Sequence, residues 1–391
     1  MPYKYSELSV CETNSLAELV ATCEDLSLST SGTKTELCKR IMAALPKKVG
    51  TGSYGCVYNK PIPCRKPWSG AGKPGIVSKW MKKKHARAEI LEHKKLKLHE
   101  IDPDNKQYIS KPHICQPTKK VAKHVEPCKD DYTGDNTWML MYTDGGVSLG
   151  QLLESGIALE RVLYGLKNVF LGVSVMNGHG KYHLDLKPDN IVVKGAPDGT
   201  QIYRLIDFGI SQDLGGRPFI NYGLYSSTYY LWPPDIIFLT GMIETAIARG
   251  REPPAMTVEQ IDTQVDSYLS KVATNYIGDK FVSNTFYDND IVEMKANIAL
   301  IIKNHQDLYK LIDGKAYYDA VASKLDVFGL GTLLMLLVRK YESSQPDLVD
   351  IVLKFINNNK ILSYNPRDRP TPNALYRKYV QMIDSAIGEL V

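Results

Sequence analysis

The sequence lacks any apolar segment long enough to cross a bilayer. Its longest apolar stretch, Leu325 to Val338, is shorter than the roughly 20 residues that a spanning helix needs, and glycines interrupt it. The first ten residues, M-P-Y-K-Y-S-E-L-S-V, contain no apolar core of the kind found in secretory signal peptides. We therefore expect an intracellular chain that has no membrane partner and is not secreted.

Closely spaced cysteine pairs are also missing. The seven cysteines all lie in the first third of the chain, and no two of them form C-x-x-C; they stand at positions 11, 23, 38, 56, 64, 115 and 128. Zinc sites and many redox motifs depend on such short spacings. The pattern predicts neither a zinc site nor a disulfide framework, and a reducing compartment fits it best.

Acidic residues are scarce in one part of the chain. Residues 46–130 contain 20 Lys and Arg against seven Asp and Glu, whereas residues 1–45 contain six acids and four bases. The basic stretch predicts either a positive surface around a phosphate-binding site or a contact for nucleic acid or an acidic protein. Aromatic residues are not regularly interleaved in it, as they are in many single-strand binders, and this favours the first interpretation.

The residues with the clearest chemistry lie between Lys181 and Asn190, in the run K-Y-H-L-D-L-K-P-D-N. Asp185 can accept the proton of an attacking hydroxyl, Lys187 can neutralise a phosphate oxygen, and Asn190 can offer an amide oxygen to Mg²⁺. Further along, Asp207-Phe208-Gly209 adds a carboxylate that could chelate the same metal ion. This combination predicts phosphoryl transfer.

These two motifs resemble the H-R-D and D-F-G motifs of eukaryotic-type protein kinases. The resemblance implies an α+β, bilobal kinase domain over 46–391, with a β-rich N-lobe at 46–140 and a helical C-lobe at 144–391. It implies that ATP and Mg²⁺, with Mn²⁺ as an alternative, are the cofactors and that Asn190 and Asp207 hold the metal. The expected partner is a protein substrate with Ser or Thr hydroxyls.

A glycine-rich run at residues 49–57 is expected to cover the ATP phosphates. A dinucleotide-binding fold would instead require a helix after the glycines, which Pro61 and Pro63 disfavour. In the resemblance, Lys79 grips the phosphates and Glu89, with Glu92 as the alternative, pairs with it. Leu140 is the expected gatekeeper. The expected ATP contacts are Val49, Gly50, Thr51, Gly52, Ser53, Tyr54, Gly55, Cys56, Val57, Lys79, Glu89, Met141 and Thr143.

Residues 10–45 show two short amphipathic helical patterns separated by Ser-Thr-Ser-Gly, and Thr33 is expected to cap the second. The run Ser31-Gly32-Thr33-Lys34, with Leu37, Arg40 and Ile41, resembles a SAP domain, a helix-extended-helix module that binds DNA. The resemblance implies phosphate contacts from Lys34, Lys39 and Arg40. The alternative is a helical hairpin that only packs on the next domain.

Several features depart from the usual kinase pattern. Position 184 is Leu where the family has an arginine, and about 90 residues separate Asp235 from Asp326, which predicts a helical insertion at about 240–318. Thr228 is expected on the substrate side of the site, as in Ser/Thr-specific members. Together with Trp232-Pro233-Pro234-Asp235 and the stretch Leu98-His99-Glu100-Ile101-Asp102-Pro103, the departures resemble kinases of large nucleocytoplasmic DNA viruses, especially iridoviruses. That resemblance implies the host cytoplasm, a virus assembly site or the virion as the location.

The leading hypothesis is an active Ser/Thr protein kinase that a SAP-like module localises to DNA. A pseudokinase scaffold is the first alternative, and a DNA-binding structural protein is the second. Lys79, Asp185, Asn190 and Asp207 are all present, so the chemistry needs no substitute groups, and this favours an active enzyme.

Overall fold

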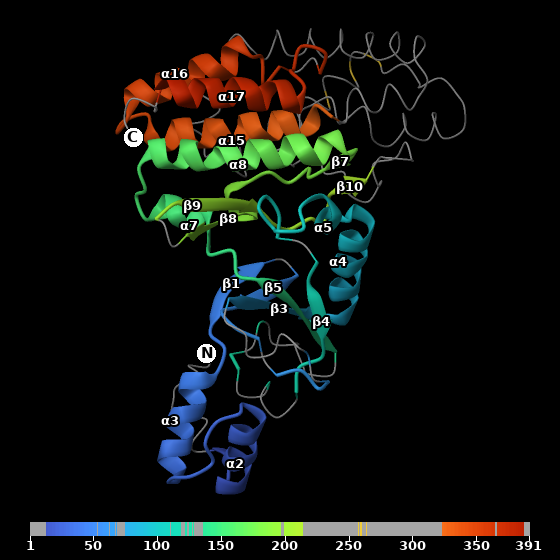
Figure 1. Cartoon of the computed structure of the whole chain (residues 1–391), viewed down its shortest axis with the longest axis vertical. Helices are drawn as coiled ribbons and strands as arrows, with labels where there is room; N and C mark the ends of the chain where they lie inside the picture. Colours follow the sequence, from blue (N-terminus) through green and yellow to red (C-terminus); the bar gives the residue numbers. More distant parts are fainter. Residues whose placement is uncertain are drawn as a thin grey trace, which may run out of the picture. The chain divides into compact units, whose positions relative to one another are not determined.

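The computed structural model describes residues 13–213 and 323–386, apart from gaps at 53, 62, 67, 69–74, 110, 119–121, 123–124, 127, 129–135, 197–198 and 364–365, together with 257, 259 and 263. The chain divides into two compact units, the first made of 1–97 and 109–145 and the second of 98–108 and 146–391. Both units combine helices with strands (Figure 1). Among the described residues, no helix is both long and apolar enough to traverse a membrane.

Some expectations fall outside this description. Ser53 and Thr228 are not among the described residues, and neither is Asp235. The same holds for the expected insertion at about 240–318, apart from residues 257, 259 and 263. These expectations therefore stay predictions.

The first unit contains a five-stranded antiparallel sheet among its described residues, in the order β1-β2-β3-β5-β4. The strand β5 alternates its side chains, so that Met139 and Met141 enter one apolar cluster and Leu140 enters another. Gly55 allows β2 to lie close to β3, because a Cβ at this position would lie 2.6 Å from the carbonyl oxygen of Trp80. The strands are β1 (Lys48–Gly52), β2 (Gly55–Tyr58), β3 (Ile76–Lys82), β4 (His113–Cys115) and β5 (Thr137–Thr143).

One helix, α4 (Lys83–Leu96), covers the Leu140 side of this sheet. Met81, Ala86 and Leu140 are buried between them, with Ile90 and Trp138 packed against this cluster. The helix ends at Leu96, and the left-handed backbone of Lys97 (φ 49°) stops it before the second unit begins. The buried cluster fixes the helix to β3 and β5, which carry residues predicted to bind ATP.

Two helices, α2 (Leu16–Asp25) and α3 (Lys34–Ala44), precede the sheet within the first unit. Ser15 and Glu18 form a capping box on α2, and Thr33 and Glu36 form another on α3. The prediction that Thr33 caps the second helix is confirmed. Each box satisfies backbone N–H groups that a short helix would otherwise leave without partners.

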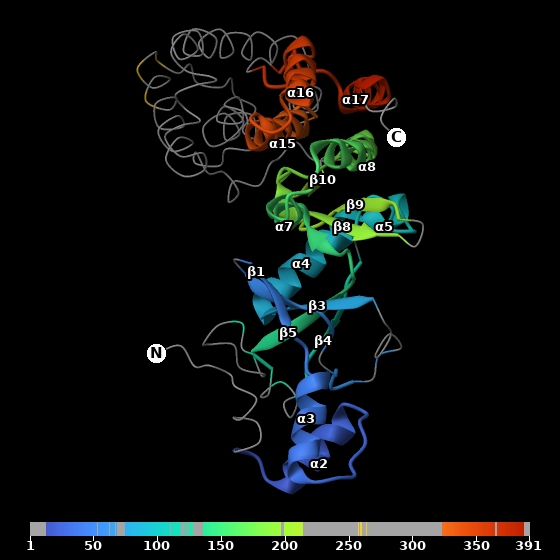
Figure 2. The same ribbon diagram turned by 90° about the vertical axis from the view of Figure 1, so that its left-hand side faces the viewer.

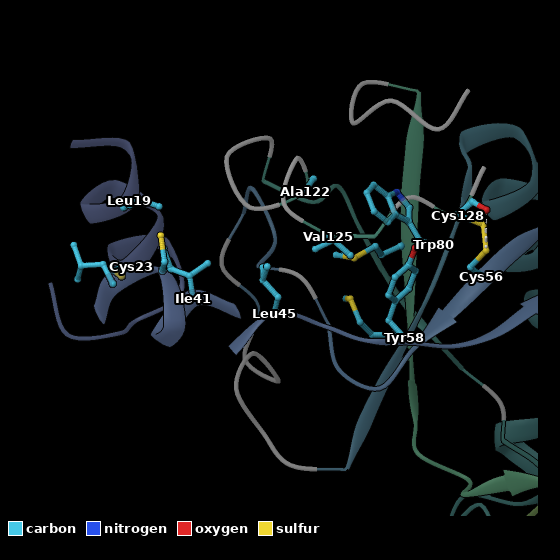
Figure 3. Close-up of a cluster of buried hydrophobic side chains, with 14 residues drawn as sticks. Leu19, Cys23, Ile41, Leu45, Cys56, Tyr58, Trp80, Ala122, Val125 and Cys128 are labelled. Carbon is cyan, nitrogen blue, oxygen red and sulfur yellow. Dashed lines mark hydrogen bonds between the residues drawn. A yellow bond between two sulfur atoms is a disulfide. The ribbon is translucent and has the colours of Figure 1, made fainter. Parts of the chain in front are cut away.

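The helical pair and the sheet share one apolar cluster (Figure 3). Leu19 and Ile41 lie at its helical end, Tyr58 and Trp80 lie at its sheet end, and Leu45 lies between the two groups in the close-up. Leu45 follows α3 directly and is 5% exposed. The alternative to a DNA-binding module was a hairpin that only packs on the next domain. Such packing is observed within this unit, and it does not decide whether the hairpin also binds DNA.

The cysteines do form disulfides, so the prediction that they build no disulfide framework is wrong. Cys56 is bonded to Cys128 and Cys64 to Cys115, over sequence separations of 72 and 51 residues, and Cys38 is also disulfide-bonded. The absence of C-x-x-C excludes only pairs that are close in sequence, whereas here the fold brings distant cysteines together. The disulfides Cys56–Cys128 and Cys64–Cys115 both lie within the first unit.

Removal of one of these bonds is expected to destabilise the first unit. A Cys64→Ser/Cys115→Ser variant should lose about 2 to 4 kcal/mol of unfolding free energy, because the bond closes a long loop in the unfolded chain. Thermal unfolding of the variant, compared with wild type before and after dithiothreitol, measures the loss. A wild-type midpoint that dithiothreitol does not lower would contradict this expectation.

The second unit is largely helical in its described part. Helices α8, α15, α16 and α17 lie against one another in Figure 1, and Figure 2 shows the same helices turned by 90°. Phe170 and Tyr379 stack at 3.9 Å between ring centroids, and the Tyr379 hydroxyl donates to the carbonyl of Leu163. The helices are α5 (Leu98–Ile101), α7 (Leu149–Glu154), α8 (Leu159–Gly178), η1 (Pro188–Asn190), α15 (Leu325–Tyr341), α16 (Pro346–Asn358) and α17 (Pro372–Ala386).

Short strands carry the predicted catalytic residues of this unit. The described strands form a ladder β6-β8-β9 and a pair β7-β10. Residues 183–190 lie between β7 and β8, and Asp207 follows β9. Chain segments distant in sequence are therefore brought to one end of these strands, which are β6 (Val147–Ser148), β7 (Lys181–Tyr182), β8 (Ile191–Gly195), β9 (Gln201–Leu205) and β10 (Gln212–Asp213).

Candidate functional site

The glycine-rich run forms the hairpin of β1 and β2. Thr51 is paired with Cys56 and Gly52 with Gly55, so the turn is tight. Tyr54 at the turn is 62% exposed, and its ring lies 4.7 Å from that of His85. Cys56 is fully buried and disulfide-bonded, so only its backbone could contact a nucleotide. The hairpin thus presents mostly backbone groups, which suits phosphate binding.

Lys79 in β3 forms an ion pair with Glu89 in α4. The ammonium nitrogen lies 2.8 Å from Oε2 and 3.0 Å from Oε1 of the carboxylate. Both side chains are largely buried, at 18% and 13% exposure. The alternative glutamate, Glu92, pairs with Lys95 on the same helix instead. The structure therefore brings Lys79 to Glu89, the first of the two candidates.

Two of the expected ATP contacts, Met141 and Thr143, lie in and at the end of β5. Met141 is 3% exposed and is paired with Ser78 on one side and His113 on the other. It therefore stands inside the sheet, where the two neighbouring strands flank its backbone. Thr143 is exposed and ends the strand. Of the two residues, Thr143 is the more exposed.

A buried carboxylate from α15 holds the loop that carries Asp185. The two oxygens of Asp326 accept the backbone N–H groups of His183 (2.9 Å) and Leu184 (2.8 Å). One of them also accepts Nδ2–H of Asn177, at 2.8 Å. Leu184 is buried and has φ 63°, a left-handed conformation that costs about 1 kcal/mol for a leucine. These hydrogen bonds hold the strained backbone in place.

Three predicted catalytic side chains meet in this loop. The Lys187 ammonium lies 2.9 and 3.0 Å from the two oxygens of Asp185, and Asn190 Nδ2 donates to the Asp185 carbonyl at 2.9 Å. The amide oxygen of Asn190 then faces away from that carbonyl. Burial raises the pKa of the Asp185 carboxyl, and the adjacent Lys187 opposes the rise. A raised pKa makes the carboxylate a better proton acceptor.

Asp207 follows β9 in the same unit and also has a left-handed backbone, with φ 61°. Its side chain is exposed, whereas the next residue, Phe208, is buried with its ring 5.2 Å from that of His183. Within the described part of the chain, no cluster of three or more His, Cys, Asp or Glu could hold a metal. An amide and a carboxylate suit Mg²⁺, which keeps waters and substrate phosphates as its other ligands.

Sequence reasoning missed two residues that shape these groups. Asp326 entered the sequence analysis only through its spacing from Asp235, although a carboxylate in an apolar helix demands buried donors and so marks an anchor. Tyr142 donates its hydroxyl to Glu89 at 2.5 Å. Nothing in a seven-residue strand pattern distinguishes this tyrosine from a packing residue.

The three basic residues of the helical pair are not equivalent. Lys34 and Lys39 are exposed on α3. The Arg40 guanidinium instead donates to the carbonyl oxygens of Ser29 (2.5 Å) and Ser31 (3.0 Å), where it holds the loop before α3. The two lysines are therefore the better placed for a phosphate backbone.

Two family models match the chain. The protein kinase domain model matches residues 44–246, slightly more than half of the chain. The SAP domain model matches residues 12–46, which include α2, α3 and their connecting loop. The two matches overlap at residues 44–46, which include Leu45 of the shared apolar cluster.

Known kinases resemble parts of the chain. Serine/threonine-protein kinase sid1 of Schizosaccharomyces pombe is 27% identical over 172 residues, which cover 43% of this chain and 34% of that protein. Serine/threonine-protein kinase ICK of Rattus norvegicus is 28% identical over 80 residues, covering 20% and 11%, and cyclin-dependent kinase F-3 of Oryza sativa subsp. japonica is 27% identical over 94 residues, covering 24% and 20%. The chain thus spans about a third or less of each of these relatives.

Proposed function

We propose that this chain, which belongs to the protein kinase family, transfers the γ-phosphate of ATP to Ser or Thr hydroxyls of proteins. One observation carries the proposal: Asp185, Lys187 and Asn190 converge in a loop that the buried carboxylate of Asp326 holds rigid. A preorganised loop of this kind can stabilise charge that develops during transfer without reorganising first.

Each residue has a distinct role in this proposal. Asp185 accepts the proton of the attacking hydroxyl, and Lys187, whose ammonium lies 2.9 Å from that carboxylate, neutralises the phosphoryl oxygens. Lys79, oriented by Glu89, binds the phosphates of ATP. Asn190 and Asp207 would hold Mg²⁺, which neutralises phosphate charge when bound. The pseudokinase alternative is disfavoured because every one of these side chains is present.

The assignment to Ser and Thr rests on the names of similar kinases and on Thr228. The proposed affiliation with large DNA viruses rests on Leu184, on the expected long insertion, and on the segments Leu98 to Pro103 and Trp232-Pro233-Pro234-Asp235. It carries with it a location in host cytoplasm, virus assembly site or virion. The Ser/Thr specificity and the viral affiliation are part of this proposal, because the family match shows only a protein kinase domain.

The test is phosphate transfer by the purified full chain. With labelled ATP, Mg²⁺ and a panel of basic and acidic proteins, we expect label in phosphoserine or phosphothreonine. An Asp185→Asn variant should be slower by about a hundredfold or more, since it has lost the proton acceptor. Asp189→Asn, a matched change at an exposed carboxylate in the same loop, should retain the rate. No transfer by the wild type, or equal rates for wild type and Asp185→Asn, would contradict the proposal.

A second activity, association with DNA, is favoured by the SAP match and by the exposed ammonium groups of Lys34 and Lys39. Two phosphate contacts give weak binding that depends on salt. This activity would bring the kinase to DNA-bound substrates without taking part in transfer.

A further inference from the structure

A chain of polar side chains crosses the apolar layer between α4 and the sheet. Tyr142, from β5, contacts Glu89 at 2.5 Å and His93 at 3.2 Å, and Glu89 contacts Lys79 on both of its oxygens. The surrounding side chains are apolar and include Met81, Ala86 and Leu140. A polar group in such a layer costs free energy unless it is hydrogen-bonded. These hydrogen bonds therefore fix the positions of the polar side chains relative to one another.

The direction of each hydrogen bond follows from the chemistry. An ionised carboxylate only accepts, so the single hydroxyl proton of Tyr142 is donated to Glu89. The hydroxyl oxygen must then accept from His93, whose Nε2 therefore carries a proton. His93 and Glu89 are one helical turn apart on α4, so Tyr142 binds one face of the helix at two points.

We propose that Tyr142 is a positioning residue that holds Glu89, and through it Lys79, in the geometry for binding ATP phosphates; this inference rests on the proposed kinase function. Lys79 must share its three N–H donors between Glu89 and a phosphate when ATP binds. The Tyr142 hydroxyl continues to donate its hydrogen bond to Glu89 while ATP is bound. It therefore fixes the carboxylate to β5 regardless of the nucleotide, and His93 fixes the tyrosine hydroxyl.

The simpler interpretation is that the Tyr142 ring only fills space against the apolar cluster of Met81, Ala86 and Leu140. The ring would then matter and the hydroxyl would not. Tyr142→Phe keeps the ring and removes the hydroxyl, so it separates the two interpretations. His93→Leu removes the supporting donor, whereas His93→Gln offers an amide N–H in nearly the same place as Nε2.

The control is a tyrosine in the same sheet whose side chain enters the other apolar cluster. Tyr58 in β2 is fully buried, and its hydroxyl donates to the carbonyl of Glu126 at 2.7 Å. Tyr58→Phe therefore removes one buried hydrogen bond from the first unit without touching Glu89. Any effect due only to lower stability should appear equally in Tyr58→Phe and Tyr142→Phe.

The experiment measures steady-state transfer, MgATP binding and thermal unfolding for these full-length variants. We expect Tyr142→Phe to lower kcat/KM for ATP about tenfold and to weaken MgATP binding by a similar factor, with an unchanged KM for the protein substrate. His93→Leu should lower kcat/KM about threefold, His93→Gln should restore it, and Tyr58→Phe should leave it at the wild-type value.

Failure of the inference can be told apart from failure of the proposed function. A wild-type kcat/KM in Tyr142→Phe, or an equal loss in Tyr58→Phe, overturns the positioning role while the kinase activity stands. If the wild type transfers no phosphate, the proposed function fails. In that case the two MgATP dissociation constants still decide, because equal constants for wild type and Tyr142→Phe overturn the inference.

Discussion

Replacement of Asp207 by Asn is expected to reduce phosphate transfer about a thousandfold while the chain stays folded. The proposed metal ligand would lose its negative charge, and phosphate charge would be less well neutralised in the transition state. A thousandfold loss corresponds to about 4 kcal/mol of transition-state stabilisation. The side chain is exposed, so its substitution creates no buried cavity.

Asparagine is the sharper substitution at this position. The backbone of Asp207 has φ 61°, a conformation that Asp and Asn tolerate better than alanine. Asp207→Asn therefore removes the charge without adding backbone strain, whereas Asp207→Ala would change both. Single-turnover transfer and circular dichroism measure the two expectations separately.

Asp213 supplies the matched control. It lies in the same unit, pairs with Lys181 at 2.9 Å, and its side chain is 31% exposed. Asp213→Asn removes the same charge six residues further along, and a partly exposed ion pair contributes little stability. We expect transfer at the wild-type rate. Wild-type turnover in Asp207→Asn would contradict the proposed metal site.

The catalytic loop could be predicted because its chemistry is local. Asp185, Lys187 and Asn190 lie within six residues, so nearly any fold that accommodates the loop keeps them close. The structure brings them together as the spacing indicated. The capping of α3 by Thr33 was predictable for the same reason, since a capping box spans one helical turn.

Contacts between distant segments were not predictable in this way. The disulfide from Cys56 to Cys128 joins residues 72 positions apart, and cysteine connectivity cannot be deduced from sequence alone. The hydrogen bond from Tyr142 to Glu89 likewise depends on how α4 lies on β5. The type of a strand residue does not determine which face of the sheet its side chain lies on. Only the fold determines which partner that side chain contacts.

Arg40 shows a different limit. Its position in a SAP-like pattern implies a phosphate contact, yet its guanidinium donates to two carbonyls of the preceding loop. Arginine carries five N–H donors, so a nearby turn can engage it before any ligand does. Sequence can identify the cation but not its partner.

A chain beginning at Pro46 is expected to lose about 4 to 8 kcal/mol of unfolding free energy in its first unit. The deletion removes the helical end of the shared apolar cluster, including Ile41 and Leu45. A buried Leu or Ile replaced by Ala costs about 2 to 5 kcal/mol, and the truncated sheet loses the contacts of at least two such side chains. Transfer to a free peptide should fall with stability, because the same unit carries Lys79 and Glu89.

Point variants separate this packing role from DNA binding. Leu45→Ala should lower the thermal midpoint and leave the helices in place, since it empties only the position between them and the sheet. Lys34→Ala/Lys39→Ala should keep the midpoint and peptide activity but reduce retention on DNA, and the salt dependence of binding should become shallower. Binding at 50 mM and 200 mM salt would measure that change.

The combination of results decides what the helical pair does. A lowered midpoint in Leu45→Ala together with weaker DNA retention in the lysine variant would mean that one element both completes the N-terminal core and contacts DNA. DNA binding could then be coupled to the stability of the unit that holds Lys79. A truncated chain with the wild-type midpoint and wild-type peptide activity would instead show that the pair is an independent module, because no packing contribution of about 4 kcal/mol could be hidden in such a measurement.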